Sequence, residues 1–230
     1  MNSSNNQTPI GAPTGARAVL WDLDGTLIDS MPYHLEAWND ILQPLGYHFS
    51  VESFLPTIGL RNGEIVRDFL KIDRPPAEIA QIAASKEERY RSILRERCLP
   101  LLPGVEHWLK QLRADGWRHA IVTSAPRRNV EATVFTTHLD RLTDTIVCAE
   151  DVINGKPHPE PFLLAADRLG VDPARCIVVE DAPAGLEGAR RAGMKSIGVL
   201  TTHAVLAADE VVKSLTDLAG DAFDSVLRDA

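Results

Sequence analysis

The sequence has little of several features that mark particular classes of protein. Only 3 cysteines occur among 230 residues, widely spaced, which fits neither a disulfide framework nor a cysteine metal motif. We therefore expect reduced thiols and a cytoplasmic protein. No apolar run approaches the roughly 20 residues of a membrane span, and no secretory signal is visible. The net charge of −8 disfavours nucleic acid as a partner, since that binding needs surplus Lys and Arg.

Charged side chains are also absent from the first sixteen residues, which are rich in Ser, Asn, Gly, Pro and Thr. We expect residues 1–16 to be a disordered tail. Elsewhere apolar residues are plentiful, and the overall share of 44% is ample for a packed core. A length of 230 residues suits one large domain or a domain that carries an inserted one.

The most informative stretch is AVLWDLDGTLIDS, residues Ala18–Ser30. Its apolar start is too short for a helix and predicts a buried parallel strand, after which Asp22, Asp24 and Gly25 form a turn. Ligands of open α/β sheets bind at this end of a strand. One of two such carboxylates can act as a nucleophile or bind a metal, while the other transfers a proton. A calcium loop is disfavoured because its twelfth position is Tyr33 instead of glutamate; an ordinary turn is the competing interpretation.

Helical periodicity dominates the chain from Met31 to Pro100, and the charged run Lys86–Arg97 predicts a solvated helix face. Beyond Pro103-Gly104, helices alternate with short apolar strands. This alternation predicts an α/β fold with a doubly wound parallel sheet. We expect strands at 118–122, 145–148, 175–179 and 195–199, helices at 105–114, 127–137, 161–169 and 183–192, and a last strand with helices over 205–230. The domains are then a core of 17–30 and 101–230 and an inserted α-helical cap of 31–100.

Three of the predicted strands end in polar residues that converge at one edge of a parallel sheet. They are Asp22 and Asp24, Thr123 and Ser124, and Glu180 and Asp181. Any one pair is also consistent with a helix cap. Lys156 lies in the proline-rich loop GKPHPEP, where the prolines stiffen the backbone and present the charge; viewed alone, it is more consistent with a solvated surface lysine. Their convergence favours a functional site.

These pieces resemble, in order and spacing, the four motifs of the haloacid dehalogenase superfamily, the aspartate-based phosphatases and phosphomutases. The matching residues are Asp22-Leu-Asp24-Gly25-Thr26, Thr123-Ser124, Lys156 and Glu180-Asp181. The resemblance covers nearly the whole chain after the tail. The segment 179–193, VEDAPAGLEGARRAG, is similar to the branch with β-phosphoglucomutase, sugar-phosphate phosphatases and glycerol-phosphate phosphatases, which carries a helical cap after the first motif.

The resemblance implies a mechanism. A Mg²⁺ ion would be held by the Asp22 carboxylate, the Asp24 backbone carbonyl and the Asp181 carboxylate, with Glu180 binding directly or through water. Asp22 would attack phosphorus to form an aspartyl-phosphate, and Asp24 would exchange protons with the leaving alcohol and with water. Lys156 and a hydroxyl of Thr123 or Ser124 would bind the phosphoryl group, and we favour Ser124.

The leading hypothesis is a Mg²⁺-dependent, monomeric phosphatase of a small phosphorylated metabolite, a sugar or polyol phosphate. The alternatives are a β-phosphoglucomutase-type mutase and, further off, a non-catalytic binding protein on the same fold. Dehalogenation is disfavoured because it requires neither Asp24 nor a metal cluster. Candidate substrate contacts in the cap are His34, Arg61 and Asn62, although His34 is also consistent with a structural histidine and Arg61 with a surface arginine.

Overall fold

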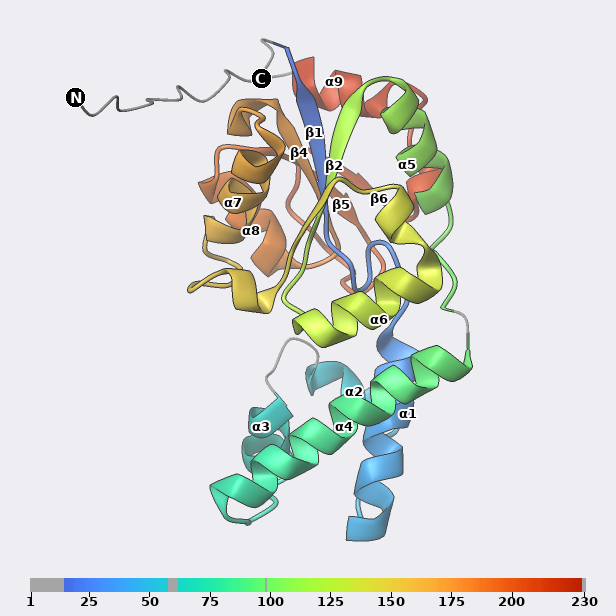
Figure 1. The fold of residues 1–230 in the computed structure, drawn as a ribbon, viewed down its shortest axis with the longest axis vertical. Helices are drawn as coiled ribbons and strands as arrows, with labels where there is room; N and C mark the ends of the chain where they lie inside the picture. The colour runs from blue at the N-terminus through green and yellow to red at the C-terminus, as the bar shows by residue number, and fades with distance from the viewer. Residues whose placement is uncertain (1–14, 58–61, 98, 229–230) are drawn as a thin grey trace, which may run out of the picture.

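The computed structural model describes residues 15–57, 62–97 and 99–228. Its centre is a six-stranded, fully parallel sheet with the strand order β3-β2-β1-β4-β5-β6 (Figure 1). The strand order places the first strand in the middle, as a doubly wound sheet requires. The strands are β1 (Arg17–Trp21), β2 (Trp117–Val122), β3 (Thr145–Val147), β4 (Cys176–Glu180), β5 (Lys195–Val199) and β6 (Glu210–Val212).

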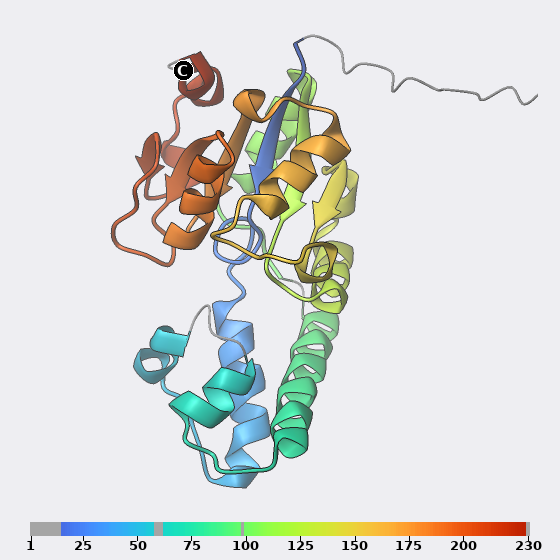
Figure 2. The ribbon, with the colours of Figure 1, turned by 90° about the vertical axis from the view of Figure 1, so that its left-hand side faces the viewer.

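Helices cover both faces of the sheet, as Figure 2 shows. Alternate residues of β1 point to opposite faces, so Val19 and Trp21 belong to one apolar cluster and Ala18 and Leu20 to another. The first face is covered by α5 (Val105–Ala114), α6 (Arg127–Thr137) and α9 (Ala222–Arg228), and the second by α7 (Glu160–Leu169) and α8 (Pro183–Arg191).

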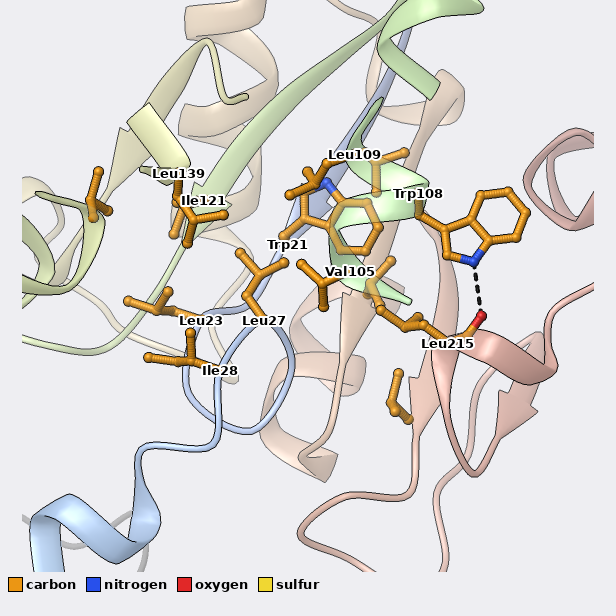
Figure 3. Packing of buried hydrophobic residues seen from close by; sticks show 14 of the residues in the cluster. Trp21, Leu23, Leu27, Ile28, Val105, Trp108, Leu109, Ile121, Leu139 and Leu215 are labelled. Carbon is orange, nitrogen blue, oxygen red and sulfur yellow. Dashed lines mark hydrogen bonds between the residues drawn. The ribbon is translucent and has the colours of Figure 1, made fainter. Parts of the chain in front are cut away.

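The apolar cluster that includes Val19 and Trp21 also holds the loop that follows β1. Leu23, Leu27 and Ile28 are fully or almost fully buried, and they pack beside Trp21 and Val105 (Figure 3). Burying side chains of this size stabilises the fold by about 1.5–3 kcal/mol each. The loop that carries Asp22 and Asp24 is therefore held by apolar packing on both sides of its turn.

Between β1 and β2 the chain forms a separate group of helices, which we call the cap. It comprises α1 (Met31–Leu42), α2 (Val51–Phe54), α3 (Asn62–Glu64) with a π-helical turn (Ile65–Phe69), and α4 (Pro76–Glu96). The long helices α1 and α4 pack side by side below the sheet. The cap has its own apolar cluster, which includes Trp38, Leu42, Phe49, Phe54, Ile65, Val66, Ile72 and Ile79.

Short 3-10 turns complete the described structure, at Gln43–Leu45, Leu55–Thr57, Leu139–Arg141, Ala149–Asp151, Pro173–Arg175 and Leu215–Asp217. Among the described helices, none has the length and apolar character needed to cross a bilayer. The predicted α/β class and parallel sheet are confirmed. The boundaries proposed for tail, core and cap remain predictions, and most of the tail lies outside the described residues.

One expectation about the cap is wrong. The charged run that begins at Lys86 is not a uniformly solvated face, because Lys86 is only 3% exposed. It lies on the buried stripe of α4 with Ile79, Tyr90 and Ile93, at the seven-, four- and three-residue spacing of one helix face. Burying a charged side chain costs free energy, because the charge loses its hydration, so a buried charge needs polar partners in the protein.

Candidate active site

The site lies at the carboxyl ends of the central strands, on the side of the sheet that faces the cap (Figure 1). Trp21 of β1 pairs with Ile121 of β2 and with Val179 of β4, so the residues that follow in each strand lie level across the sheet. The Asp22 amide donates to the Val179 carbonyl at 3.0 Å. This register brings Asp22 beside Glu180, the last residue of β4.

Lys156 joins these strand ends from the loop before α7. Its ammonium group donates to Asp22 Oδ1 at 2.5 Å, to Glu180 Oε1 at 2.6 Å and to the Val122 carbonyl at 2.9 Å. Burial acts to lower the pKa of Lys156, but the charges of Asp22 and Glu180 outweigh it and hold that pKa above its ordinary value. The lysine is therefore a fixed positive charge inside the site.

Three buried carboxylates surround this lysine. Asp22, Glu180 and Asp181 each offer an oxygen within 4.8 Å of the others. Burial, with the neighbouring negative charges, raises the pKa of Asp22 well above its usual range, and burial raises the pKa of Asp181 to about 6. Three acidic groups against one ammonium leave surplus negative charge. This all-oxygen donor set fits a hard divalent cation such as Mg²⁺.

Two glycines make room for these carboxylates. A Cβ atom at Gly185, in the first turn of α8, would lie 1.8 Å from Glu180 Oε1. A Cβ atom at Gly25 would lie 2.1 Å from Asp181 Oδ2, and Gly25 also has a φ of +90°, which side-chain-bearing residues rarely adopt. The Thr202 hydroxyl donates to Asp181 Oδ2. The absence of a side chain at these two glycines thus leaves room for the carboxylates of Glu180 and Asp181.

Asp24 lies where the chain leaves the core for the cap. The Ser30 hydroxyl donates to Asp24 Oδ1, which fixes the carboxylate just before α1. Burial raises the pKa of Asp24 in spite of this hydrogen bond and of the charge of Lys86. A carboxyl group with a raised pKa can hold a proton nearer to neutral pH than an exposed aspartate can.

The structure places the two hydroxyl groups of the second motif differently. Thr123 directly follows β2 and is buried, and its Oγ1 accepts the Ala125 amide at 3.0 Å. Ser124 is exposed. Which of the two hydroxyl groups binds the phosphoryl group stays a prediction.

The candidate cap residues are placed differently from one another. His34 stacks on Tyr90 with ring centroids 3.9 Å apart, and its Nδ1 lies 2.9 Å from Lys86 Nζ. Burial lowers the pKa of His34 well below its usual range, and Lys86 adds to the effect, so this imidazole is neutral. Asn62 donates to Glu87 Oε1. Arg61 lies outside the described residues.

The sequence did not predict the polar contacts among Lys86, Glu87 and Asn129, which lie in α4 and α6. Lys86 Nζ donates to Glu87 Oε1 at 2.9 Å, and Asn129 in α6 donates to Glu87 Oε2. The position of Lys86 on the apolar stripe of α4 is a signal that could have revealed its burial. Glu87 and Asn129 have no such local signal, because their contact joins two different helices and the residues are 42 positions apart in the chain.

A surface hollow of about 600 Å³ lies elsewhere, along α8 and β5, and is lined by residues such as Leu186, Arg190 and Asp209. It includes none of the carboxylates around Lys156. The candidate site is therefore defined by the chemistry and convergence of its side chains, and not by the size of a hollow.

Comparison with known proteins identifies the class. Residues 16–193 match the model of the family described as haloacid dehalogenase-like hydrolase, and the chain belongs to this family. It is 32% identical over 184 residues to the fructose-1-phosphate phosphatase YqaB of Escherichia coli (strain K12), covering 79% of this chain and 95% of the relative.

Two further relatives define the branch. The β-phosphoglucomutase of Bacillus subtilis (strain 168) is 30% identical over 209 residues, covering 88% of this chain and 91% of the relative. The structure of CbbY from Rhodobacter sphaeroides in complex with xylulose-(1,5)-bisphosphate superimposes with a TM-score of 0.79 at 28% identity, covering 90% of this chain and 98% of that one. The relatives thus include both a phosphatase and a phosphomutase.

Proposed function

We propose that this protein is a Mg²⁺-dependent phosphatase that hydrolyses a small sugar or polyol phosphate through an aspartyl-phosphate on Asp22. The observation that carries the proposal is the buried ammonium group of Lys156, which contacts both Asp22 and Glu180. A phosphate dianion and a carboxylate nucleophile repel each other, and a fixed cation between them reduces that repulsion. The phosphatase named among the relatives supports the same reaction type.

In the first step, an oxygen of Asp22 attacks phosphorus and the bond from phosphorus to the ester oxygen breaks. The leaving alkoxide takes a proton from Asp24, whose raised pKa suits a general acid. In the second step, a water molecule gives a proton back to Asp24 and attacks phosphorus. The bond to Asp22 breaks, which releases inorganic phosphate and restores the free carboxylate.

The remaining site residues hold the phosphoryl group. Lys156 neutralises charge beside Asp22, and the hydroxyl group of Ser124 or of Thr123 binds a phosphoryl oxygen. The carboxylates of Asp22 and Asp181 and the Asp24 carbonyl would hold Mg²⁺, with Glu180 binding directly or through water. When bound, the ion supplies positive charge that offsets the charge of the phosphoryl oxygens.

The cap covers this site and supplies groups for the rest of the substrate. His34, Asn62 and Arg61 are the candidates for these contacts, and His34 lies beside Lys86 near Asp24. The printed name of the Escherichia coli relative, a fructose-1-phosphate phosphatase, supports a phosphorylated sugar as the substrate class.

The second candidate is a phosphomutase, which the Bacillus subtilis relative favours. It would share the aspartyl-phosphate on Asp22, but a sugar hydroxyl group instead of water would accept the phosphoryl group. Incubation with glucose 1-phosphate, a bisphosphate primer and Mg²⁺ separates the two. Free phosphate indicates the phosphatase, and an isomeric sugar phosphate indicates the mutase.

The test of the proposal is phosphate release from a panel of sugar, polyol and nucleotide monophosphates and from p-nitrophenyl phosphate, with and without Mg²⁺. We expect Mg²⁺-dependent turnover that Asp22→Asn lowers by about 10³-fold or more, because that variant loses the nucleophile. Asp29→Asn is the matched control, since Asp29 is an exposed aspartate of the same loop. Equal turnover by the Asp22→Asn variant contradicts the proposal.

A further inference from the structure

A loop outside the four motifs contacts the acidic centre. It follows β5 and includes Thr202 and His203. The Thr202 hydroxyl group donates to Asp181 Oδ2, and His203 Nδ1 lies 3.0 Å from the Asp181 carbonyl oxygen. Because a carbonyl oxygen can only accept a hydrogen bond, Nδ1 is the donor in this contact. Two adjacent residues of the loop therefore hold Asp181, one at its side chain and one at its backbone.

Thr202 also lies against the turn of the first motif. A Cβ atom at Gly25 would lie 2.8 Å from Thr202 Oγ1, and the same atom would overlap Asp181 Oδ2. The hydroxyl group and the oxygen to which it donates thus share the small space beside the Gly25 backbone. Asp181 is only 4% exposed, and Thr202 is half-buried. The turn after Asp24 and the loop after β5 therefore enclose one oxygen of Asp181 from two sides.

The three carboxylates of the acidic centre differ in how their oxygens are occupied. Glu180 accepts from Lys156 at Oε1, at 2.6 Å, and from the Ala182 amide at Oε2, at 2.9 Å. Lys156 also donates to Asp22 Oδ1, at 2.5 Å. Asp22 and Asp181 each keep a second oxygen outside these contacts, Oδ2 and Oδ1 respectively. We therefore expect these two oxygens to meet a cation directly.

The direction of such an oxygen is not fixed by the aspartate side chain alone. The last torsion of an aspartate is broad, so the carboxylate can turn unless another group holds it. A hydrogen bond to one oxygen sets this rotation and thereby the direction of the other oxygen. Mg²⁺ demands near-ideal octahedral geometry, and losing a partner that orients a metal ligand typically weakens metal binding by about 10–100-fold.

We propose that Thr202 is a positioning residue of the metal site, whose hydroxyl group sets the rotation of the Asp181 carboxylate so that Oδ1 faces the cation. This inference rests on the proposed function, which places Mg²⁺ at Asp22 and Asp181. It adds a residue that the four motifs do not contain and that lies beyond the family match, which ends at residue 193. The ligand class is a small, hard divalent cation.

The experiment is calorimetric titration of the metal-free, full-length protein with MgCl₂, without substrate. Thr202→Val keeps the approximate volume and removes the donor, so the dissociation constant should rise by about tenfold or more. Thr202→Ser keeps a hydroxyl group and should stay within about threefold of the wild type. Thr202→Ala also lacks the donor and takes less space, so it should show the same loss without crowding the loop.

Thr201→Val is the matched control, because Thr201 is the adjacent threonine and is exposed. It should keep the wild-type dissociation constant. A second readout is phosphate release from p-nitrophenyl phosphate at increasing Mg²⁺ concentration. Thr202→Val should need about tenfold more Mg²⁺ for half of its maximal rate, while that maximal rate stays within about threefold of the wild type. A residue that served only the fold would not shift the Mg²⁺ dependence in this way.

The inference is overturned if Thr202→Val and Thr202→Ala bind Mg²⁺ as tightly as the wild type. An equal loss in Thr202→Ser would also overturn it, because the hydroxyl group would then not be the group that matters. Absence of Mg²⁺ binding by the wild type would instead refute the Mg²⁺ dependence in the proposed function, so the two failures are distinguishable.

Discussion

At the scale of single residues, the site depends as much on missing side chains as on present ones. Gly185 lies in α8, where alanine would ordinarily be the better helix former by about 1 kcal/mol. Here its Cβ position is taken by the Glu180 carboxylate, with three atoms of that side chain between 1.8 and 2.5 Å away. Glycine is therefore retained for close approach and not for backbone freedom.

We predict that Gly185→Ala displaces the Glu180 carboxylate from Lys156. The free energy of unfolding should fall by about 1–3 kcal/mol, the usual effect of forcing a methyl group into a filled space, and phosphate release should fall by about tenfold or more. Chemical denaturation and a phosphate-release assay measure the two effects. Gly220→Ala is the control, because no atom lies within 4 Å of its Cβ position. Wild-type stability and activity in Gly185→Ala would show that Glu180 is not held as described.

The second motif shows how far single residues can be assigned from sequence. The pair Thr123-Ser124 is recognisable as a polar strand end, but sequence does not say which hydroxyl group is buried. The structure buries Thr123 and exposes Ser124, because Thr123 continues directly from β2 and the chain turns after it. Which of the two adjacent residues is buried depends on this turn, and the local sequence pattern does not predict where the turn falls.

At the scale of elements, α4 combines a solvated face with a buried ionic one. Its charged sequence predicts the first, and the burial of Lys86 among apolar residues overturns that expectation for part of the helix. Sequence periodicity can place Lys86 on the inner stripe of α4, because that relation lies within one helix. It cannot place Asn129 of α6 against Glu87, because that contact depends on how the two helices pack.

We predict that Glu87 of α4 makes the stability of the fold depend on pH in the acid range. The pKa of Glu87 is lowered to about 2, so its ionised form stabilises the fold above its ordinary pKa of about 4.5, and this stabilisation is lost as the pH falls toward 2. Between pH 5 and pH 3, wild type should therefore lose about 2 kcal/mol of unfolding free energy that Glu87→Gln does not lose.

Urea denaturation at the two pH values measures this difference. Glu78→Gln is the control, since Glu78 is an acidic residue of the same helix with a side chain that is 56% exposed, and surface ion pairs contribute little. It should follow the pH dependence of the wild type closely. Parallel losses in wild type and Glu87→Gln would mean that Glu87 is not the buried, paired carboxylate described.

At the scale of the whole molecule, the acidic centre joins segments that are distant in the chain. Asp22, Lys156 and Asp181 come from three separate loops, and the parallel sheet brings them together. This convergence can be predicted from sequence, because all carboxyl ends of a parallel sheet lie on one edge. The position of the cap over that edge and the contacts of the cap cannot be predicted in this way, since they depend on packing between separate groups of helices.

We predict that Mg²⁺ stabilises the folded protein. Burial, together with the neighbouring carboxylates, raises the pKa of Asp22 and of Asp181, and a bound divalent cation would compensate for the buried negative charge. At a concentration 100 times the dissociation constant, the expected gain is about 2.7 kcal/mol, seen as a higher midpoint of thermal unfolding. Asp181→Asn should reduce the gain, whereas Asp140→Asn, at an exposed aspartate, should not. An equal shift in all three proteins would contradict a site at Asp181.

The central claim is that Asp22 receives the phosphoryl group, and the most direct measurement is mass spectrometry of enzyme quenched in acid during turnover. The substrate is p-nitrophenyl phosphate with Mg²⁺, and the digested peptide that contains Asp22 is examined for one added phosphoryl group. We predict this modification on Asp22 in the wild type and its absence in the Asp22→Asn variant. Turnover of the wild type with the phosphoryl group on another residue would contradict the account.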